Sequence, residues 1–242
     1  MEFRLKQLNI LESKEQLDSL PDGKLLINCI NAHSYNTALR DPDFAKALVE
    51  GDVLIPDGMS IVKACKWLKA KSQPKERVAG WDLFVYEMNK LNNNKEGNQK
   101  VMFVGSSNKV LALITKNASK EYPNLKVITY SPPFKTQFSD NDNKEIVEAI
   151  NKANPNLLWI GMTAPKQEKW IFENWKSLNI NCHVGTIGAV FDFFAGTAKR
   201  APIWWQKHGL EWLHRLIIKP DKIWKRYLIG NILFVKTIIT IG

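Results

Sequence analysis

The sequence predicts an α/β fold of the Rossmann-like type, in which a mainly parallel sheet is flanked by helices. Between residues 24 and 188, short apolar runs of strand length alternate with longer segments of helical period, a pattern typical of a parallel sheet covered by helices. The 242 residues are 45% hydrophobic and 24% charged. This composition provides a full core and excludes a disordered or fibrous chain.

The predicted elements follow from local patterns. Short apolar runs bounded by turn residues are predicted as strands at residues 24–30, 52–56, 100–105, 126–130, 156–161 and 181–188. Segments of helical period are predicted as helices at residues 34–51, 58–71, 81–94, 108–123, 142–155 and 166–178. Residues with capping side chains mark two helix starts, at Ser107 or Asn108 and at Asp140 or Asn141.

The composition changes near residue 195, and we expect a Rossmann-like body of residues 1–195 and a helical appendage of residues 196–242. Residues 195–242 contain nine Lys or Arg and two Asp or Glu, a net charge of +7, whereas the whole chain carries +10. Four of the nine tryptophans lie in this segment: Trp204, Trp205, Trp212 and Trp224. A basic, Trp-rich segment indicates an anionic partner, which is nucleic acid, a lipid surface or a phosphorylated substrate.

Two interpretations of the appendage remain open. Residues 199–231 are predicted to form two helices separated by Pro220, with Leu210, Leu213 and Ile217 on one apolar stripe. The stripe fits a helix packed on the core, and the Trp and Lys/Arg residues beside it fit a helix lying at a membrane surface. The last 16 residues are interrupted by Lys236 and are shorter than the ~20 residues of a spanning helix. We expect them to lie on a membrane and not to cross it.

Cysteine usage and the acidic motifs indicate neither a disulfide framework nor a metal site. Cys29, Cys65 and Cys182 are far apart and form no CxxC pair, which favours a reducing, cytoplasmic compartment. The N-terminus lacks the apolar core of a signal peptide. The DxD segments 41–43 and 140–142 have a metal-binding spacing, but both begin helices, where capping is the commoner role. We predict no catalytic metal and no cofactor.

Candidate ligand-binding residues come from the loops after the predicted strands, where open α/β sheets bind ligands. The phosphate-binding motifs GxGxxG and GxxxxGK[ST] are absent, as are GxSxG and HExxH. Asp57 is either a general base or the cap of the following helix. Gly105 and Ser106 either receive a phosphate or ribose, or serve ordinary capping. Gln167 is placed near a helix start, and Glu168 beside it is predicted to be a solvated acid of the first turn.

Several segments together resemble the WecG/TagA/CpsF family of bacterial glycosyltransferases. The resemblance runs from about residue 24 to residue 230 and is carried by IPDGMSIV, ERVAGWDLF, FVGSS, YSPPF, GMTAPKQEKW and IGAVFDFFAGTAKRAPIWWQKHGLEWLHRLI. It implies a catalytic body that binds a UDP-sugar and transfers the sugar, with inversion and without a metal, to an undecaprenyl-diphosphate-linked saccharide. It also implies attachment to the inner face of the cell membrane, in the biosynthesis of a surface polysaccharide or teichoic acid.

The resemblance implies roles for individual residues. Asp57, in the PDG motif, is implied to be the catalytic base, with Gln167 of the PKQE segment orienting sugar or acceptor. Asn31 matches the family, but Cys29 stands where the family often has Thr, and a thiol is a weak hydrogen-bonding group. The remaining substrate-binding candidates are Arg77, Gly105, Ser106, Gly185 and Gly188. Arg77 is suited to a diphosphate, and a surface ion pair with Glu76 or Asp82 is the alternative.

The appendage is implied to contact the membrane and the lipid diphosphate through Arg215, Lys222, Lys225 and Arg226. From this we expect that truncation after Gly196 leaves a folded body without membrane association or activity. The alternative function is a basic nucleic-acid-binding protein that uses the C-terminal tail. The cations flank an apolar stripe and do not form a polar face, so we expect an anionic membrane surface and no nucleic acid as partner. A homo-oligomer remains possible.

Overall fold

The computed structural model describes residues 3–94, 97–218, 224 and 228–241. Its strands form a six-stranded sheet in the order β2-β1-β6-β5-β3-β4, and the paired strands are parallel. The strands are β1 Leu25–Ile30, β2 Val53–Pro56, β3 Gln99–Gly105, β4 Leu125–Tyr130, β5 Leu157–Gly161 and β6 His183–Thr186. The predicted α/β class is confirmed, and each predicted strand lies within two residues of an observed one at either end.

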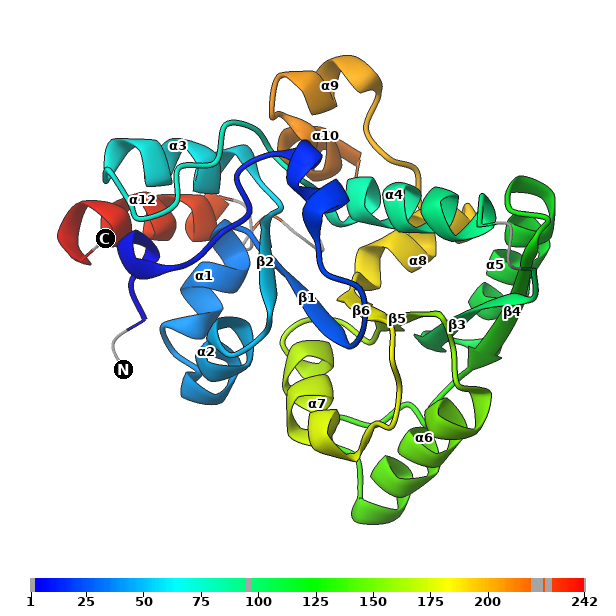
Figure 1. The fold of residues 1–242 in the computed structure, drawn as a ribbon. Helices are drawn as coiled ribbons and strands as arrows, with labels where there is room; N and C mark the ends of the chain where they lie inside the picture. The colour runs from blue at the N-terminus through cyan, green and yellow to red at the C-terminus, as the bar shows by residue number, and fades with distance from the viewer. Residues whose placement is uncertain (1–2, 95–96, 219–223, 225–227, 242) are drawn as a thin grey trace. The chain divides into compact units, whose positions relative to one another are not determined.

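Helices connect the strands and continue beyond the last of them, as Figure 1 shows. They are α1 Ala32–Ala38, α2 Pro42–Val49, α3 Met59–Trp67, α4 Gly80–Asn92, α5 Asn108–Glu121, α6 Asp140–Ala153, α7 Lys166–Asn174, α8 Gly188–Ala195, α9 Ile203–Lys207, α10 Glu211–Ile218 and α12 Gly230–Ile241. Short 3-10 helices are η1 Leu5–Gln7, η2 Lys14–Ser19 and η3 Trp175–Ser177. Within the described residues, no helix combines the length and the apolar character needed to span a membrane.

Helix boundaries differ from the sequence predictions in several places. Helix α8 was not predicted, and α9 and α10 both lie before Pro220, which was expected to separate the two helices of residues 199–231. Two further differences concern helix starts. The helix predicted at residues 34–51 is divided into α1 and α2, because Asp41 caps α2 through the Phe44 N–H and Pro42 occupies the first helical position. The predicted N-cap of α6 at Asp140 or Asn141 is wrong, since Ser139 is the N-cap and Asp142 completes a capping box with it. Ser107 is confirmed as the N-cap of α5.

The chain folds as two compact units that interleave along the sequence. Unit 1 comprises residues 1–18, 29–79 and 199–242, and unit 2 comprises residues 19–28 and 80–198. The predicted division into a Rossmann-like body of residues 1–195 and a helical appendage of residues 196–242 stays a prediction.

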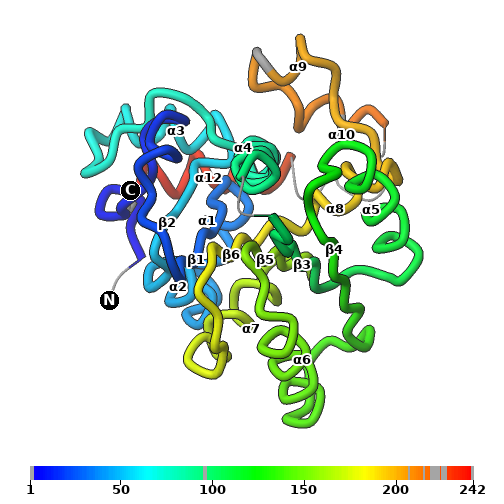
Figure 2. Tube along the Cα trace, turned by 45° about the vertical axis from the view of Figure 1, so that its right-hand side comes forward, coloured from blue at the N-terminus to red at the C-terminus, as the bar shows by residue number. Residues whose placement is uncertain are grey.

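Unit 2 is a three-layered arrangement in which helices cover both faces of its strands. Figures 1 and 2 show α6 and α7 on one face and α4, α5 and α8 on the other. Alternate residues of β5 serve the two layers, because side chains alternate along a strand. Leu158 and Ile160 belong to the apolar cluster with α6 and α7, whereas the ring of Trp159 lies 5.6 Å from that of Phe84 on α4.

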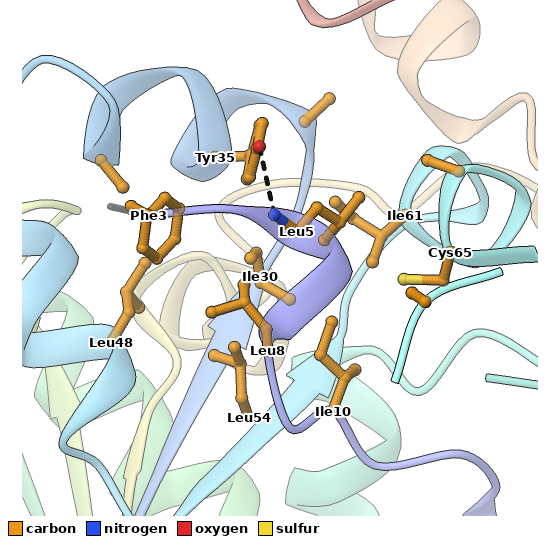
Figure 3. Packing of buried hydrophobic residues seen from close by; sticks show 14 of the residues in the cluster. Phe3, Leu5, Leu8, Ile10, Ile30, Tyr35, Leu48, Leu54, Ile61 and Cys65 are labelled. Atoms are coloured by element: carbon orange, nitrogen blue, oxygen red, sulfur yellow. Dashed lines mark hydrogen bonds between the residues drawn. The ribbon is translucent and has the colours of Figure 1, made fainter. Parts of the chain in front are cut away.

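Unit 1 has its own core, built by segments from both ends of the chain. Figure 3 shows Phe3, Leu5, Leu8 and Ile10 of the N-terminal segment packed with residues of β1, β2, α1, α2 and α3. The Leu5 N–H donates to the Tyr35 hydroxyl oxygen at 3.2 Å. The buried ring of Tyr35 also contacts Phe234 of α12 edge-on at 5.6 Å. The last described helix is therefore part of the unit 1 core.

Candidate active-site residues

In unit 1, the loop after β2 and the end of β1 bring Asp57 and Asn31 together. The Asp57 N–H donates to the Ile30 carbonyl oxygen at 2.8 Å, which ties the β2 loop to the end of β1. A Cβ on Gly58 would lie 3.5 Å from the Asn31 Cβ, so the two loops are in van der Waals contact there. The N-cap of α3 is Gly58 and not Asp57. Asp57 thus precedes the N-cap of α3 and is half-exposed, and its role as a base stays a prediction.

Asn31 has both a structural role and an unused donor. Its Oδ1 accepts from the backbone N–H groups of His33 and Ser34, each at 3.0 Å, and so caps α1. This fixes the amide orientation, because the oxygen must face the helix. Among the described residues nothing accepts from its Nδ2, which can therefore donate to a ligand. Cys29, two residues earlier, is the half-exposed position of β1 and is in no disulfide with a described residue.

Arg77 lies beside the same loop and forms an ion pair, but with neither Glu76 nor Asp82. The Val78 N–H donates to the Pro56 carbonyl oxygen at 3.1 Å, which holds this segment next to Asp57. The Arg77 Nη2 donates to Glu211 Oε2 at 2.9 Å, where the two side chains are 16% and 13% exposed. Arg200 approaches the same carboxylate oxygen at 4.0 Å.

Glu211 on α10 is a residue that the sequence reasoning missed. It is the partner of Arg77, in place of Glu76 or Asp82 of the alternative interpretation, because α10 belongs to unit 1 and packs next to the Arg77 segment. A signal was present, since Glu211 and Asp221 are the two acids among nine cations of the C-terminal segment. An acid in a basic stretch is expected to form an ion pair, but the sequence does not indicate which cation it meets.

In unit 2, Gly105 and Ser106 are fixed by neighbouring strand ends. The φ angle of Gly105 is +124°, and a Cβ there would lie 2.2 Å from the Gly161 carbonyl oxygen, so only glycine fits. The Ser106 N–H donates to that same oxygen at 3.1 Å, and Ser131 Oγ donates to the Ser106 carbonyl oxygen at 2.8 Å. The half-exposed Ser106 hydroxyl has no partner among the described residues, and capping of α5 falls to Ser107. Ser106 is thus available to a ligand.

The two glycines near the end of β6 occupy different surroundings. A Cβ on Gly185 would lie 2.3 Å from the Trp159 ring, so packing alone accounts for glycine at that position. A Cβ on Gly188, the first residue of α8, would lie 2.8 Å from Gln167 Oε1. Gly188 therefore allows Gln167 to approach the start of α8. A direct substrate contact of either glycine stays a prediction.

Gln167 and Glu168, at the start of α7, form a buried polar pair. Gln167 Oε1 accepts from the Met162 N–H at 3.1 Å, and Gln167 Nε2 donates to Glu168 Oε1 at 2.8 Å. The expectation that Glu168 is solvated is wrong, because the residue is only 2% exposed. Burial raises the pKa of its carboxyl to about 7, against the hydrogen bonds from Gln167 and from its own backbone N–H, which lower it.

The tail cations implied by the resemblance fall largely outside the described residues. Arg215 lies in α10, and its side chain is not described, while Lys222, Lys225 and Arg226 lie outside the described residues. Within the described part of the chain, no three His, Cys, Asp or Glu side chains gather in a way that could hold a metal ion. The independence from metal stays a prediction. Burial raises the pKa of the Cys65 thiol to about 11 and that of Cys182 to about 12, which disfavours the nucleophilic thiolate form of both.

Comparisons with known proteins give a consistent result. The model of the family described as "Glycosyl transferase WecG/TagA/CpsF family" matches residues 1–240. A Bacillus subtilis (strain 168) relative is 30% identical over 203 residues, which cover 84% of this chain and 75% of the relative. Relatives from Bacillus spizizenii and Staphylococcus aureus (strain NCTC 8325) are each 28% identical and cover 79% and 84% of this chain, and 70% and 74% of their own lengths. All three are named N-acetylglucosaminyldiphosphoundecaprenol N-acetyl-beta-D-mannosaminyltransferase.

Proposed function

The chain belongs to the WecG/TagA/CpsF family of glycosyltransferases, and we propose that it transfers an N-acetylmannosaminyl group from a UDP-sugar to N-acetylglucosaminyl-diphospho-undecaprenol. The observation that carries the proposal is the match of the family model to nearly the whole chain, together with the shared name of the relatives. The product would enter a cell-surface polysaccharide or teichoic acid.

The arrangement in unit 1 supports an inverting single displacement. Asp57 accepts the proton of the attacking acceptor hydroxyl, which raises the nucleophilicity of that oxygen. The free Nδ2 of Asn31, held beside the Asp57 loop, donates to a substrate oxygen. Attack from the face opposite the leaving UDP converts an α-linked donor into a β-linked product.

In a reaction without a metal, cationic side chains stabilise the negative charge that develops on the departing diphosphate. Arg77 offers a fixed fork of donors for this purpose. Because its guanidinium is paired with Glu211 at 2.9 Å, diphosphate binding exchanges one anionic partner for another. Arg215, Lys222, Lys225 and Arg226 are proposed to add charge from the tail.

The C-terminal segment supports attachment at the cytoplasmic membrane surface. Its large apolar side chains with high exposure include Ile203, Trp204, Ile217, Ile218, Ile232, Val235 and Ile239. Exposed apolar groups of this number, among Lys and Arg, are typical of helices at a membrane interface. The same charge first suggested nucleic acid, but lipid and diphosphate account for both the cations and the apolar face.

The test is a transfer assay with UDP release as readout. The wild-type protein is incubated with UDP-N-acetylmannosamine and a short-chain lipid-diphosphate-N-acetylglucosamine, with other UDP-sugars as comparisons. We expect transfer with the N-acetylmannosamine donor, retained in the presence of chelator. Absence of transfer with that donor, alongside transfer from another UDP-sugar, would reject the sugar and keep the reaction class.

Asp57→Asn tests the proposed base in the same assay. Asparagine keeps the size of the side chain but cannot accept a proton, so we expect turnover to fall by at least about 100-fold while UDP binding stays measurable by calorimetry. Asp52→Asn, an exposed change just before β2, at the opposite end of that strand from Asp57, is the matched control. Near-normal turnover of Asp57→Asn contradicts the assignment of the base.

A further inference from the structure

The amide of Gln167 is held at both of its ends. Its oxygen accepts from the Met162 N–H at 3.1 Å, and its nitrogen donates to Glu168 Oε1 at 2.8 Å. A flipped amide would place an N–H against the Met162 N–H and an oxygen against the carboxyl oxygen. The contact with the Met162 N–H would then be repulsive in either protonation state of Glu168, so the orientation of the amide is determined.

This arrangement leaves one directed donor. An amide nitrogen carries two hydrogens, and one of those on Gln167 Nε2 is used by Glu168. Within the described residues no acceptor is found for the other. Gln167 lies next to the loop after β5 and the start of α8, since a Cβ on Gly188 would lie 2.8 Å from its Oε1 and 3.3 Å from the Thr163 nitrogen. These are strand-end positions, where an open α/β sheet binds its ligand.

The burial of the Glu168 carboxyl is unfavourable for protein stability, which a purely structural role does not explain. It is 2% exposed, and its Oε2 is buried without a hydrogen-bond partner among the described residues. Burying a carboxyl with an unsatisfied oxygen is unfavourable, and an apolar side chain of similar length would avoid that cost. No salt bridge of the described residues offsets it, and Gln167 is the side chain that hydrogen-bonds to the carboxyl.

The backbone around the pair is also constrained. Thr163 has a φ of +79°, in the left-handed region that a β-branched residue rarely adopts. Its carbonyl oxygen accepts from the Gln167 N–H at 3.3 Å. A strained loop that persists beside a buried, half-satisfied carboxyl is a combination that clusters at functional sites.

We propose that Glu168 is a positioning residue of the transfer reaction: through Oε1 it fixes the amide of Gln167, so that the second Nε2 hydrogen is presented to the substrate. This rests on the proposed function, because it requires that Gln167 contacts a substrate. Glu168 itself does not touch the reacting atoms. In its protonated form the proton resides on Oε2, and Oε1 still accepts from Gln167.

A set of four variants tests the proposal by transfer kinetics. Glu168→Met removes the acceptor at similar length, Glu168→Gln keeps an acceptor oxygen, Gln167→Met removes the amide, and the fourth combines Glu168→Met with Gln167→Met. Glu173→Met, an exposed change on the same helix, is the control.

We expect Glu168→Met to lower kcat/KM by roughly 10- to 100-fold, the size of one lost hydrogen bond to a charged group. Glu168→Gln should remain within about threefold of wild type, because its carbonyl oxygen replaces Oε1. The double variant should be no slower than Gln167→Met alone, since Glu168 acts through Gln167. A merely structural role predicts additive losses and no rescue by glutamine.

A second readout does not depend on turnover. The side-chain amide protons of Gln167, assigned by their loss in Gln167→Met, are followed in a ¹⁵N-resolved NMR spectrum. We expect one proton shifted downfield and protected from exchange in wild type and Glu168→Gln, and neither feature in Glu168→Met. Equal amide signals in all three proteins, or wild-type kinetics of Glu168→Met, overturns the positioning role. If the wild-type protein transfers no sugar but shows the expected NMR pattern, the proposed function and the catalytic part of this role are overturned. The hydrogen bond by which Glu168 orients the Gln167 amide would still stand.

Discussion

His183 illustrates how partners on both ring nitrogens determine a charge state. Its Nδ1 lies 2.9 Å from Glu87 Oε1 and its Nε2 lies 2.9 Å from the Pro21 carbonyl oxygen. Both partners accept, so both nitrogens donate only if the imidazole is protonated. Burial lowers the pKa of His183, whereas the hydrogen bond to Glu87 and the charge of Glu87 raise it. The raising effects together are larger, so the net shift is upward from 6.5.

This shift predicts a stability that falls as the pH rises. Between pH 6.5 and the raised pKa of the folded state, the native protein binds more protons at His183 than the unfolded chain does. The free energy of unfolding therefore decreases as the pH rises through that window. Below pH 6.5 the stabilising contribution of His183 is fully present. We expect Glu87→Gln to cost about 2 kcal/mol at pH 6 and to abolish the decline, measured by urea unfolding from pH 5.5 to 8.5.

The control separates this effect from that of Glu168. The Glu168 carboxyl, with its pKa raised to about 7, also makes the free energy of unfolding fall with rising pH. This fall occurs in the lower window from pH 4.5 to 7. Glu168→Gln removes that contribution and leaves the His183 window intact. A decline above pH 7 that persists unchanged in Glu87→Gln contradicts the assignment to His183.

Helix α10 contributes Glu211, the ion-pair partner of Arg77, which is a proposed diphosphate-binding residue. Glu211 neutralises Arg77 at 2.9 Å, and Arg200 approaches the same oxygen. If Arg77 binds the diphosphate, Glu211 competes for it. We expect Glu211→Gln to strengthen UDP binding by about 3- to 10-fold, because the removed charge no longer competes with the phosphates. Isothermal calorimetry at fixed ionic strength measures this.

The matched control for Glu211 is Glu76→Gln. It removes the same charge from the residue next to Arg77, where the carboxylate accepts from the Lys14 N–H instead. We expect no change in UDP affinity for Glu76→Gln. Weaker binding by Glu211→Gln would show that Glu211 orients Arg77 and does not compete with the ligand.

The elements differ in how far their sequence determines them. The strands were predictable because each is a short apolar run bounded by turn residues, and a parallel sheet buries both of its faces. The division of residues 34–51 into α1 and α2 was also readable, since Asp41 followed by Pro42 is a helix start. The helical period continues across residues 34–51, but the capping role expected of segment 41–43 already indicated a helix start there, and Asp41 is confirmed as the N-cap of α2.

The loops that carry the candidate site residues were predictable from the sequence, but the ion-pair and hydrogen-bond partners of these residues were not. Asp57, Asn31 and Gln167 follow strands, so their loops were identifiable from position alone. The pairing of Arg77 with Glu211 joins residues 134 positions apart, and no local pattern specifies it. The burial of Glu168 was missed because a first-turn acid is normally solvated. Its environment is set by the approach of Gln167 to α8, which depends on tertiary packing.

On the scale of the whole molecule, the C-terminal segment has a structural role in addition to its charge. Phe234 and Ile238 of α12 are buried in the unit 1 core with Tyr35 and the N-terminal segment. Asn36 Nδ2 donates to the Gly230 carbonyl oxygen at 2.7 Å. The net charge of +7 in residues 195–242 is therefore carried by a segment that unit 1 needs for its own packing.

Truncation after Gly196 consequently tests packing as well as membrane attachment. The sequence alone led us to expect a folded body, but the contacts of α12 predict otherwise for unit 1. Loss of two buried apolar side chains, of the order of 3–5 kcal/mol for a single large one, should unfold or loosen α1 and η1. Unit 2 has a separate core and should stay folded. Hydrogen exchange resolved by mass spectrometry measures both units, and unchanged protection of α1 contradicts this prediction.

A surface variant isolates the membrane role from the packing role. Ile232, Val235 and Ile239 lie on the exposed face of α12 at 71%, 55% and 65% exposure, whereas Phe234 and Ile238 face the core. Replacing the three exposed residues by Asn removes apolar area without opening a cavity, so unit 1 should keep its wild-type hydrogen exchange. Binding to vesicles that contain phosphatidylglycerol should weaken at least about tenfold, because each large apolar side chain contributes ~1.5–3 kcal/mol when fully buried and only part of it inserts. Full vesicle binding by this variant, with the fold intact, would place the membrane contact elsewhere on the chain.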